Sequence, residues 1–235
     1  MDGLGDAFAA ACALVTSLDG ELARIVWLSL RTSLLAVGLA CAIGMPFGAL
    51  LATSRFPGRG ALTVATSALM GLPPVVVGLA VYLMLSAGGP LAPLRLLYTP
   101  AAMVIAQAIL VTPIIAALTR ETVAAMNEEY DELLRSMNAG PLFRLGTLLH
   151  DARFALTTAA LAGLGRALAE VGAVMIVGGN IAHATRVMTT SIALETSKGE
   201  LALALALGGF LVALSILIHG ALHALRGRAE ALAHA

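Results

Sequence analysis

The chain has 235 residues, of which 59% are hydrophobic and 12% charged, and its mean hydropathy is +0.93. A soluble domain carries about a quarter charged residues, so this composition excludes an ordinary soluble protein and indicates a membrane protein. Lys plus Arg and Asp plus Glu both number 14, so the net charge is zero and no basic excess favours binding to nucleic acid.

Residue composition also predicts the kind of membrane protein. The 24 glycines and an aromatic content of 4% favour closely packed helices over an aromatic-girdled barrel, so we expect an all-α membrane protein. Cys12 and Cys41 both lie in apolar runs. Without a Cys-x-x-Cys motif or a Cys/His cluster, the sequence predicts neither a disulfide framework nor a metal site.

The N-terminal apolar run at residues 7–18 is too short to cross a bilayer. Asp2 and Asp6 stand where a signal peptide would carry basic residues. We therefore expect residues 7–18 to form a short helix that lies along the membrane interface.

Five longer stretches follow in chain order. A hydrocarbon core about 30 Å thick needs about 20 helical residues, and four stretches of that length carry no charge. They predict transmembrane helices near residues 25–52, 61–86, 97–118 and 201–224. A fifth span is expected at residues 154–180, which carry Arg166 and Glu170 four residues apart on one helix face.

Arginine placement predicts the orientation. Five spans put the termini on opposite sides, and a cytoplasmic C-terminus places most loop cations inside, as the positive-inside rule favours. The inner cations are then Arg55, Arg59, Arg120, Arg135, Arg144, Arg153, Arg226 and Arg228, and the outer ones are Arg24, Arg95, Arg186 and Lys198. The N-terminus is therefore expected outside.

This topology divides the chain into three parts. We expect an extracytoplasmic or interfacial segment at residues 1–21, a transmembrane domain at 22–225 and a cytoplasmic tail at 226–235. The transmembrane domain includes a long polar cytoplasmic loop at residues 119–153. Gly140-Pro141 should separate two short helices in this loop. Such a loop is either a docking surface or a plain solvated hairpin.

The loop resembles the cytoplasmic coupling loop of bacterial ABC importer permeases, whose pattern is Glu-Ala-Ala, three residues, Gly, nine residues, then Ile-x-Leu-Pro. Glu132 stands at the first position and Leu148 at the isoleucine. Asn138 replaces the glycine and His150-Asp151 replaces the Leu-Pro pair. These departures bear on the contact made at Asn138 and leave the role of the loop unchanged.

Further stretches are similar to molybdate, sulfate and tungstate permeases. They are residues 28–33 (LSLRTS), 55–59 (RFPGR) and 71–78 (GLPPVVVG). Residues 165–181 (GRALAEVGAVMIVGGNI) and 189–196 (TTSIALET) resemble the tungstate-type subfamily in particular. The resemblance implies a type I ABC importer transmembrane fold that moves tungstate or a similar oxyanion into the cytoplasm.

The same resemblance implies the partners: cytoplasmic ABC ATPase subunits, an extracytoplasmic oxyanion-binding protein and a second copy of this chain in the bilayer. The sequence contains no G-x-x-x-x-G-K-[ST] phosphate loop, so we expect a transport subunit without enzymatic activity or a cofactor of its own, with ATP and Mg²⁺ bound by the partner ATPase. The residues expected to couple to the ATPase are Glu132, Arg135, Asn138, Ala139, Gly140, Pro141 and Leu148.

Arg166 and Glu170 are ionisable residues within a predicted span, where charges are costly and face a partner or a water-filled cavity. One interpretation is an i,i+4 ion pair that keeps the helix in register. The other is that Arg166 attracts a passing oxyanion while Glu170 limits how tightly it is held.

Pro73, Pro74 and Pro113 also lie in apolar runs, where each should bend or break a helix. They mark a gate or are ordinary membrane-helix prolines.

Polar residues follow the predicted outer end of the span at residues 154–180, in an expected hydroxyl-rich loop with one cation. Their hydroxyl and guanidinium groups can donate hydrogen bonds to a tetrahedral dianion. Helix termination with loop capping and contact with the docked binding protein are the alternatives. The candidate residues are Asn180, Thr185, Arg186, Thr189, Thr190 and Ser191.

The sequence leaves rival functions open. Tungstate and molybdate share shape, charge and nearly the same size, so import of molybdate, or of sulfate, is the alternative within the same class. A self-sufficient channel or secondary transporter is the alternative from another class. It would be expected to hold more intramembrane ionisable groups and inverted repeats.

Overall fold

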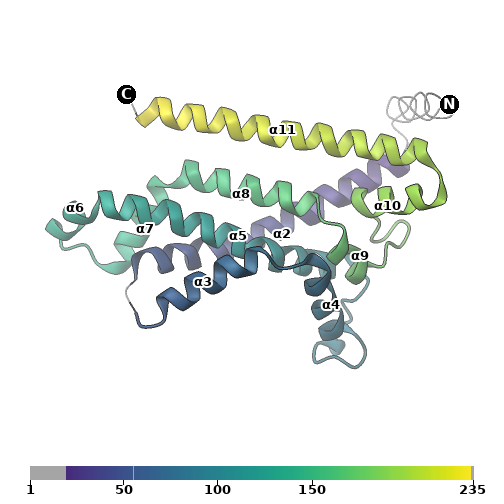
Figure 1. The fold of residues 1–235 in the computed structure, drawn as a ribbon, viewed down its shortest axis with the longest axis horizontal. Coiled ribbons are helices and arrows are strands. Elements are labelled where there is room, and N and C mark those ends of the chain that lie inside the picture. The colour runs from purple at the N-terminus through teal and green to yellow at the C-terminus, as the bar shows by residue number, and fades with distance from the viewer. Residues whose placement is uncertain (1–19, 55, 234–235) are drawn as a thin grey trace. The chain divides into compact units, whose positions relative to one another are not determined.

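The computed structural model describes residues 20–54 and 56–233, and these residues are helical with no β-strand among them (Figure 1). The all-α prediction is therefore confirmed. The expected interfacial helix at residues 7–18 lies outside the described residues. The elements are α2 (Gly20–Thr53), α3 (Arg59–Met70), α4 (Pro74–Leu85), the 3₁₀ helix η1 (Ala92–Leu94), α5 (Pro100–Glu129), α6 (Asp131–Ser136), α7 (Pro141–Asp151), α8 (Arg153–Leu168), α9 (Gly172–Gly178), α10 (Met188–Lys198) and α11 (Leu201–Ala233).

Candidate membrane spans agree in number with the sequence. Helix α2, helix α5 and the first part of α11 are each long and apolar enough to cross a membrane. Two bent pairs, α3 with α4 and α8 with α9, bring the number among the described residues to five when each pair is taken as one span. The prediction of about five transmembrane helices is thus confirmed by length and composition.

Two of the predicted spans are broken. Between α3 and α4 the chain leaves the helix near Gly71, with Pro73 at the N-cap and Pro74 in the first turn of α4. Proline suits this position because its missing N–H would have no intrahelical partner there. The span predicted at residues 154–180 is likewise divided, into α8 and the short α9.

Pro113 does not break its helix, because α5 continues through it from Pro100 to Glu129. A proline removes one backbone hydrogen bond, and membrane helices tolerate this loss where neighbouring helices and hydroxyl side chains support them. The adjacent Thr112 donates its hydroxyl to the Ala108 carbonyl at 2.6 Å.

Two helices extend beyond their predicted ends. Helix α5 continues past residue 118 to Glu129, so part of the predicted loop at residues 119–153 is helical. Helix α11 continues past residue 224 to Ala233, so most of the predicted tail at residues 226–235 is helical as well. The α5 extension contains Ala, Glu and Met and the α11 extension contains Ala, Leu and Arg, which are good helix formers whether or not a bilayer surrounds them.

The chain forms two compact units, and long helices contribute to both. Unit 1 comprises Met1–Ala36, of which residues 20–36 are described, together with Pro73–Gln107 and Gly165–Ile218. Unit 2 comprises Val37–Leu72, Ala108–Leu164 and His219–Ala235.

In unit 1, α4 packs closely against α9, as Figure 1 shows. Small residues permit the close approach, since a Cβ added at Gly78 would lie 2.7 Å from Cα of Ala173. Val77, Val81 and Val177 are buried in this unit. This packing of α4 against α9 holds the chain in place immediately after the α8–α9 break.

In unit 2, glycines bring α2 and α8 against α5. A Cβ added at Gly44 would lie 2.9 Å from the Thr112 carbonyl oxygen, and one at Gly48 would collide with the Ala116 carbonyl oxygen. On α8, a Cβ at Gly163 would lie 2.8 Å from a methyl carbon of Val111. These close contacts are typical of membrane helices that pack through small residues.

Candidate functional site

The first candidate site is the loop formed by the end of α5 with α6 and α7. Helix α6 begins with two acids, Asp131 and Glu132, which are favourable at a helix N-terminus. After α6 the chain turns at Asn138, whose φ of 49° is left-handed, and Gly140 leads into α7 with Pro141 in its first turn. The sequence therefore predicted the helix, turn and helix of this loop at the right residues.

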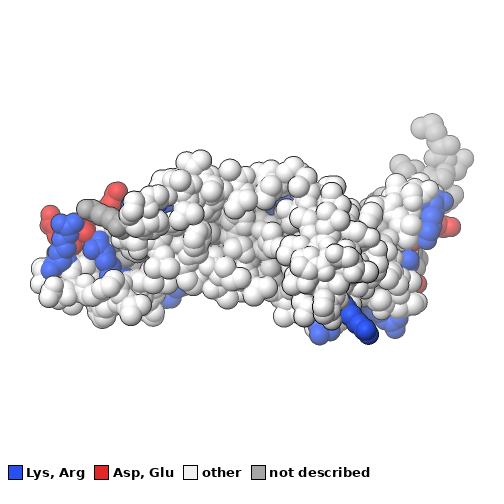
Figure 2. Space-filling view, turned by 90° about the horizontal axis from the view of Figure 1, so that it is seen from below, with Lys and Arg blue, Asp and Glu red and all other residues white. Residues whose placement is uncertain are grey.

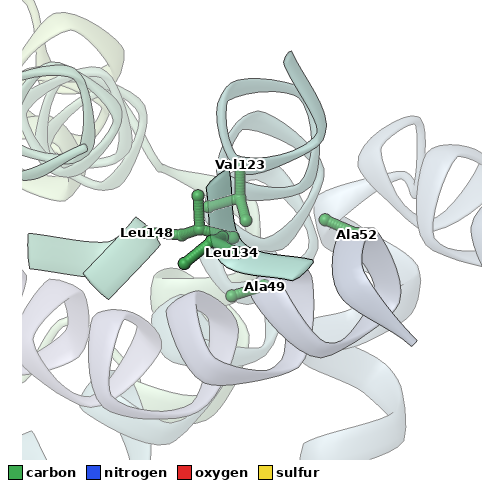
Figure 3. Packing of buried hydrophobic residues seen from close by; sticks show 5 residues of the cluster. All are labelled: Ala49, Ala52, Val123, Leu134 and Leu148. Carbon is green, nitrogen blue, oxygen red and sulfur yellow. The ribbon is translucent and has the colours of Figure 1, made fainter. Parts of the chain in front are cut away.

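A hydrophobic cluster fixes the loop to the rest of unit 2. Figure 3 shows its five buried side chains gathered together, contributed by α2, α5, α6 and α7: Ala49, Ala52, Val123, Leu134 and Leu148. Leu148 is fully buried. Its expected contact with an ATPase is therefore not available at the surface, and its role in this structure is to hold α7 in place.

A polar clamp joins the same helices. The Arg144 Nη2 of α7 lies 2.6 Å from Asp131 Oδ1 on α6, and Arg144 Nε donates to Asn127 Oδ1 on α5 at 2.7 Å. Arg135 approaches the other Asp131 oxygen at 2.8 Å. The hydrogen bond from Arg144, together with the positive charge of Arg135, holds the pKa of Asp131 below its ordinary value of 3.8.

The outer surface of α6 and α7 carries large hydrophobic side chains. Leu142 is 83% exposed, and Leu133, Met137 and Phe143 are also exposed. Figure 2 shows acidic and basic side chains gathered at this α6–α7 end of unit 2. Exposed apolar side chains rimmed by charges are typical of a surface that binds another protein.

The remaining residues predicted for coupling lie at this surface. Glu132, Arg135, Asn138, Gly140 and Pro141 are exposed, and Ala139 is half-buried between α6 and α7. We refer below to the exposed residues of α6, α7 and the turn between them as the α6–α7 surface.

The second candidate site is the α8–α9 break in unit 1. Arg166 Nη1 donates to Glu170 Oε2 at 2.8 Å, so the two charges form the ion pair that their spacing predicts. The other carboxylate oxygen, Oε1, accepts the backbone N–H of Ala173 at 3.1 Å and so caps the start of α9. From α10, Thr189 Oγ1 donates to the Glu170 carbonyl at 2.8 Å.

A buried amide, which sequence reasoning missed, supports this break. Gln107 of α5 donates to the Ala167 carbonyl of α8 at 3.0 Å and to Ser33 Oγ of α2 at 3.4 Å. The available signal was a single amide within an apolar span, where polar side chains commonly join helices. The clamp that Arg144 forms was also missed, because its partners Asp131 and Asn127 lie 13 and 17 residues away in the sequence.

Most hydroxyl groups of the predicted outer loop bond within the protein. Thr189, Thr190 and Ser191 are buried in α10, so their assignment to a loop was wrong. Thr185 Oγ1 donates to the Gly178 carbonyl, and Thr190 Oγ1 bonds to the backbone of Val187. Val187, the residue before α10, has no side-chain acceptor for the first turn, and its own backbone N–H donates to Thr190 Oγ1 at 3.1 Å.

The charged and amide groups near α9 are similarly engaged. Asn180 follows the left-handed Gly179, and its Nδ2 donates to the Thr190 carbonyl at 3.3 Å. Arg186 lies 3.8 Å from Glu21, and Arg24 bonds to His183 Nδ1 at 2.8 Å. These contacts connect the start of α2 to the segment between α9 and α10. Asn180 Oδ1 and Arg186 Nε are buried and have no hydrogen-bond partner among the described residues.

Sequence comparison identifies the family. Residues 44–230 match the family described as "Binding-protein-dependent transport system inner membrane component". The chain belongs to this family. The permease is 37% identical over 226 residues to the tungstate uptake system permease protein TupB of Peptoclostridium acidaminophilum, with 96% of this chain and 99% of that protein covered. TupB of Campylobacter jejuni is 34% identical, with 96% and 95% covered.

The fold of the permease has a solved counterpart. An inward-facing structure of the MetNI methionine ABC transporter matches 90% of this chain and 97% of its own, with a TM-score of 0.71 and 19% identity. The family match and this likeness confirm the expected type I importer fold and the multi-pass inner-membrane location. A binding protein and an ATPase are the partners that such a transport subunit requires.

Proposed function

We propose that this permease is the membrane-spanning subunit of an ATP-driven importer that moves tungstate into the cytoplasm. The observation that carries the proposal is the 37% identity to a tungstate uptake permease over nearly the full length of both proteins. The tungstate-type stretch at residues 165–181 forms the end of α8, the break and α9, which are the parts of the chain that surround the intramembrane ion pair.

In the proposed complex, two copies of the permease are joined by two cytoplasmic ATPase subunits and receive the oxyanion from an extracytoplasmic binding protein. ATP and Mg²⁺ are bound by the ATPase, and the permease needs no cofactor. The N-terminus faces outward, and the α6–α7 surface faces the cytoplasm together with the tail at residues 226–235.

The α6–α7 surface is the proposed docking site for the ATPase. Exposed Leu142 and Phe143 supply apolar contacts, and Glu132 and Arg135 supply charges at its edge. The hydrophobic cluster and the Arg144–Asp131 clamp connect the surface to α2 and α5. Movement of a docked ATPase is therefore transmitted to helices that enter the membrane.

Molybdate and sulfate are the alternative substrates, because all three are tetrahedral dianions. Discrimination in such a system resides in the binding protein as well as in the permease. A test of the proposal must therefore load the same binding protein with each anion in turn and measure how the assembled complex responds.

The test measures ATP hydrolysis by the purified complex in proteoliposomes. We expect the tungstate-loaded binding protein to stimulate hydrolysis severalfold over the empty binding protein, and stimulation should require the permease. Stimulation by the molybdate-loaded form alone would replace tungstate by molybdate as the substrate. No stimulation by any of the three loaded forms, with the complex intact by size-exclusion chromatography, would contradict an importer of this class.

A further inference from the structure

Arg166 carries a charge deep within a candidate membrane span. It lies in the last turn of α8, near the middle of the α8–α9 pair that begins at Arg153 and ends at Gly178. Ionisable side chains at such positions face a protein interior or a water-filled cavity in place of lipid. The environment of the Arg166 guanidinium therefore has to be polar.

Glu170 is fully engaged by the protein. Its side chain is 3% exposed, one carboxylate oxygen bonds to Arg166 and the other caps Ala173, while Thr189 occupies its backbone carbonyl. The segment is closely packed, since a Cβ added at Gly172 would lie 2.9 Å from a methyl carbon of Val75. Glu170 is thus a buried acceptor whose two carboxylate oxygens are both bonded within the protein.

Arg166 is engaged on one side only. Its side chain is 36% exposed, and among the described residues its single hydrogen-bond partner is Glu170. A guanidinium has five N–H donors in a planar fork, so most of them remain available on the side away from Glu170. Ala169, on the following turn, is exposed and too small to cover this edge.

We propose that the free edge of Arg166 contacts the oxyanion as it passes through the permease, and that Glu170 is the positioning residue that holds Arg166 in place. A planar guanidinium can bond to a carboxylate with one edge and to a tetrahedral dianion with the other, which an ammonium group cannot do with the same geometry. Glu170 also neutralises the pair, so the anion is held weakly and is released. This inference rests on the proposed import of an oxyanion.

The competing explanation is an ion pair that only stabilises the α8–α9 break. A neutral double variant, Arg166→Met with Glu170→Gln, separates the two explanations. Glutamine retains an oxygen that can cap Ala173, and the paired change leaves no unpartnered buried charge. Both explanations therefore expect the double variant to fold, but only a purely stabilising pair allows it to transport normally.

The experiment measures uptake of radiolabelled tungstate into proteoliposomes at saturating loaded binding protein, together with the ATP hydrolysed per tungstate transported. We expect the double variant to retain its unfolding temperature and stimulated ATP hydrolysis, while uptake falls roughly tenfold or more, the loss expected for one charge-assisted hydrogen bond. Wild-type uptake by the double variant would overturn the role of Arg166.

A matched control lies in the same unit. Lys198 Nζ bonds to the buried Glu195 at 2.9 Å, so this pair also joins a half-exposed cation to a buried acid. The corresponding double variant, Lys198→Met with Glu195→Gln, should keep uptake within about twofold of wild type, since the pair lies at the end of α10 and not at the break. An equal loss in both double variants would contradict a specific role for Arg166.

A second variant tests the same role of Arg166 if the Arg166→Met, Glu170→Gln double variant fails to assemble. Glu170→Gln alone leaves Arg166 without its neutralising partner, so tungstate should bind the purified permease more tightly and slow its own transport at high concentration. Unchanged inhibition by tungstate would overturn the inference. Failure of the wild-type complex to take up tungstate would instead contradict the proposed function, so the two failures are distinguishable.

Discussion

Asn138 occupies the turn between α6 and α7 with a left-handed backbone, φ 49°. In the resembled coupling-loop pattern a glycine stands at this position, and asparagine is one of the few other residues that adopt this conformation readily. From the sequence alone, asparagine in place of glycine indicated that the contact made at position 138 differs from that of the family pattern. The left-handed backbone gives another reason for the replacement, because asparagine and glycine both allow this turn.

We predict that Asn138→Gly leaves the protein stable, whereas Asn138→Val lowers its stability by about 1–2 kcal/mol, because a β-branched residue is strained in the left-handed region. Thermal unfolding of the purified variants in detergent measures the difference. Equal unfolding temperatures for the glycine and valine variants would show that the turn does not depend on this backbone conformation.

Asp131 gives the loop a predictable dependence on pH. Its pKa in the folded protein lies below the ordinary 3.8, with the hydrogen bond from Arg144 as the largest cause. The ionised carboxylate therefore stabilises the folded state above the unfolded pKa, and this contribution is lost as the pH falls through the folded pKa.

The corresponding measurement compares the unfolding temperatures of wild type and Asp131→Asn across pH. We expect a constant difference in favour of wild type from pH 7 to about pH 4, and a shrinking difference below that. A difference that stays constant to the lowest pH at which the protein remains soluble would show that the Arg144–Asp131 clamp does not contribute through its charge.

At the scale of elements, glycine contacts determine which helices approach closely. Gly48 of α2 has no room for a side chain against the Ala116 carbonyl of α5, whereas Gly38 of the same helix has nothing within 4 Å of an added Cβ. We predict that Gly48→Ala destabilises the protein by about 1–3 kcal/mol, because the helices must separate. The control Gly38→Ala should be neutral or stabilising in the same unfolding assay, and equal effects would contradict the packing of α2 on α5.

The α6–α7 surface provides a prediction for coupling. Leu142→Ser with Phe143→Ser should leave the unfolding temperature nearly unchanged, because both side chains are exposed, while the amount of ATPase that copurifies falls at least severalfold. The control is Leu91→Ser with Leu94→Ser, two exposed leucines in or beside η1 and outside the α6–α7 surface. Normal copurification with the double serine variant would place the docking site elsewhere.

Helix breaks show how far local sequence signals extend. Pro73-Pro74 predicted the break between α3 and α4, because proline at a helix start is a local property of the chain. Pro113 lies inside α5 without breaking it, since tertiary support decides whether a helix continues through a proline. The break after α8 contains no proline, and it depends on the capping oxygen of Glu170 and on Thr189 of α10, which are contacts that the sequence alone does not reveal.

At the scale of the whole molecule, composition and the length of apolar runs sufficed to predict an all-α membrane protein with about five spans. Resemblance along residues 28–210 then predicted the importer fold that the family match confirms. Residue roles were harder to predict. The hydroxyl groups of α10 and Leu148 have suitable chemistry for a contact with substrate or partner, yet they are buried, and burial depends on the complete packing of each unit.

The central claim is that the permease imports tungstate only as part of an ATP-driven complex, and radiolabelled tungstate uptake into proteoliposomes tests it most directly. With the ATPase and the binding protein present, we predict uptake that requires ATP and that excess molybdate or sulfate reduces only weakly. Uptake by the permease alone, with neither partner nor ATP, would contradict the account and indicate a self-sufficient transporter.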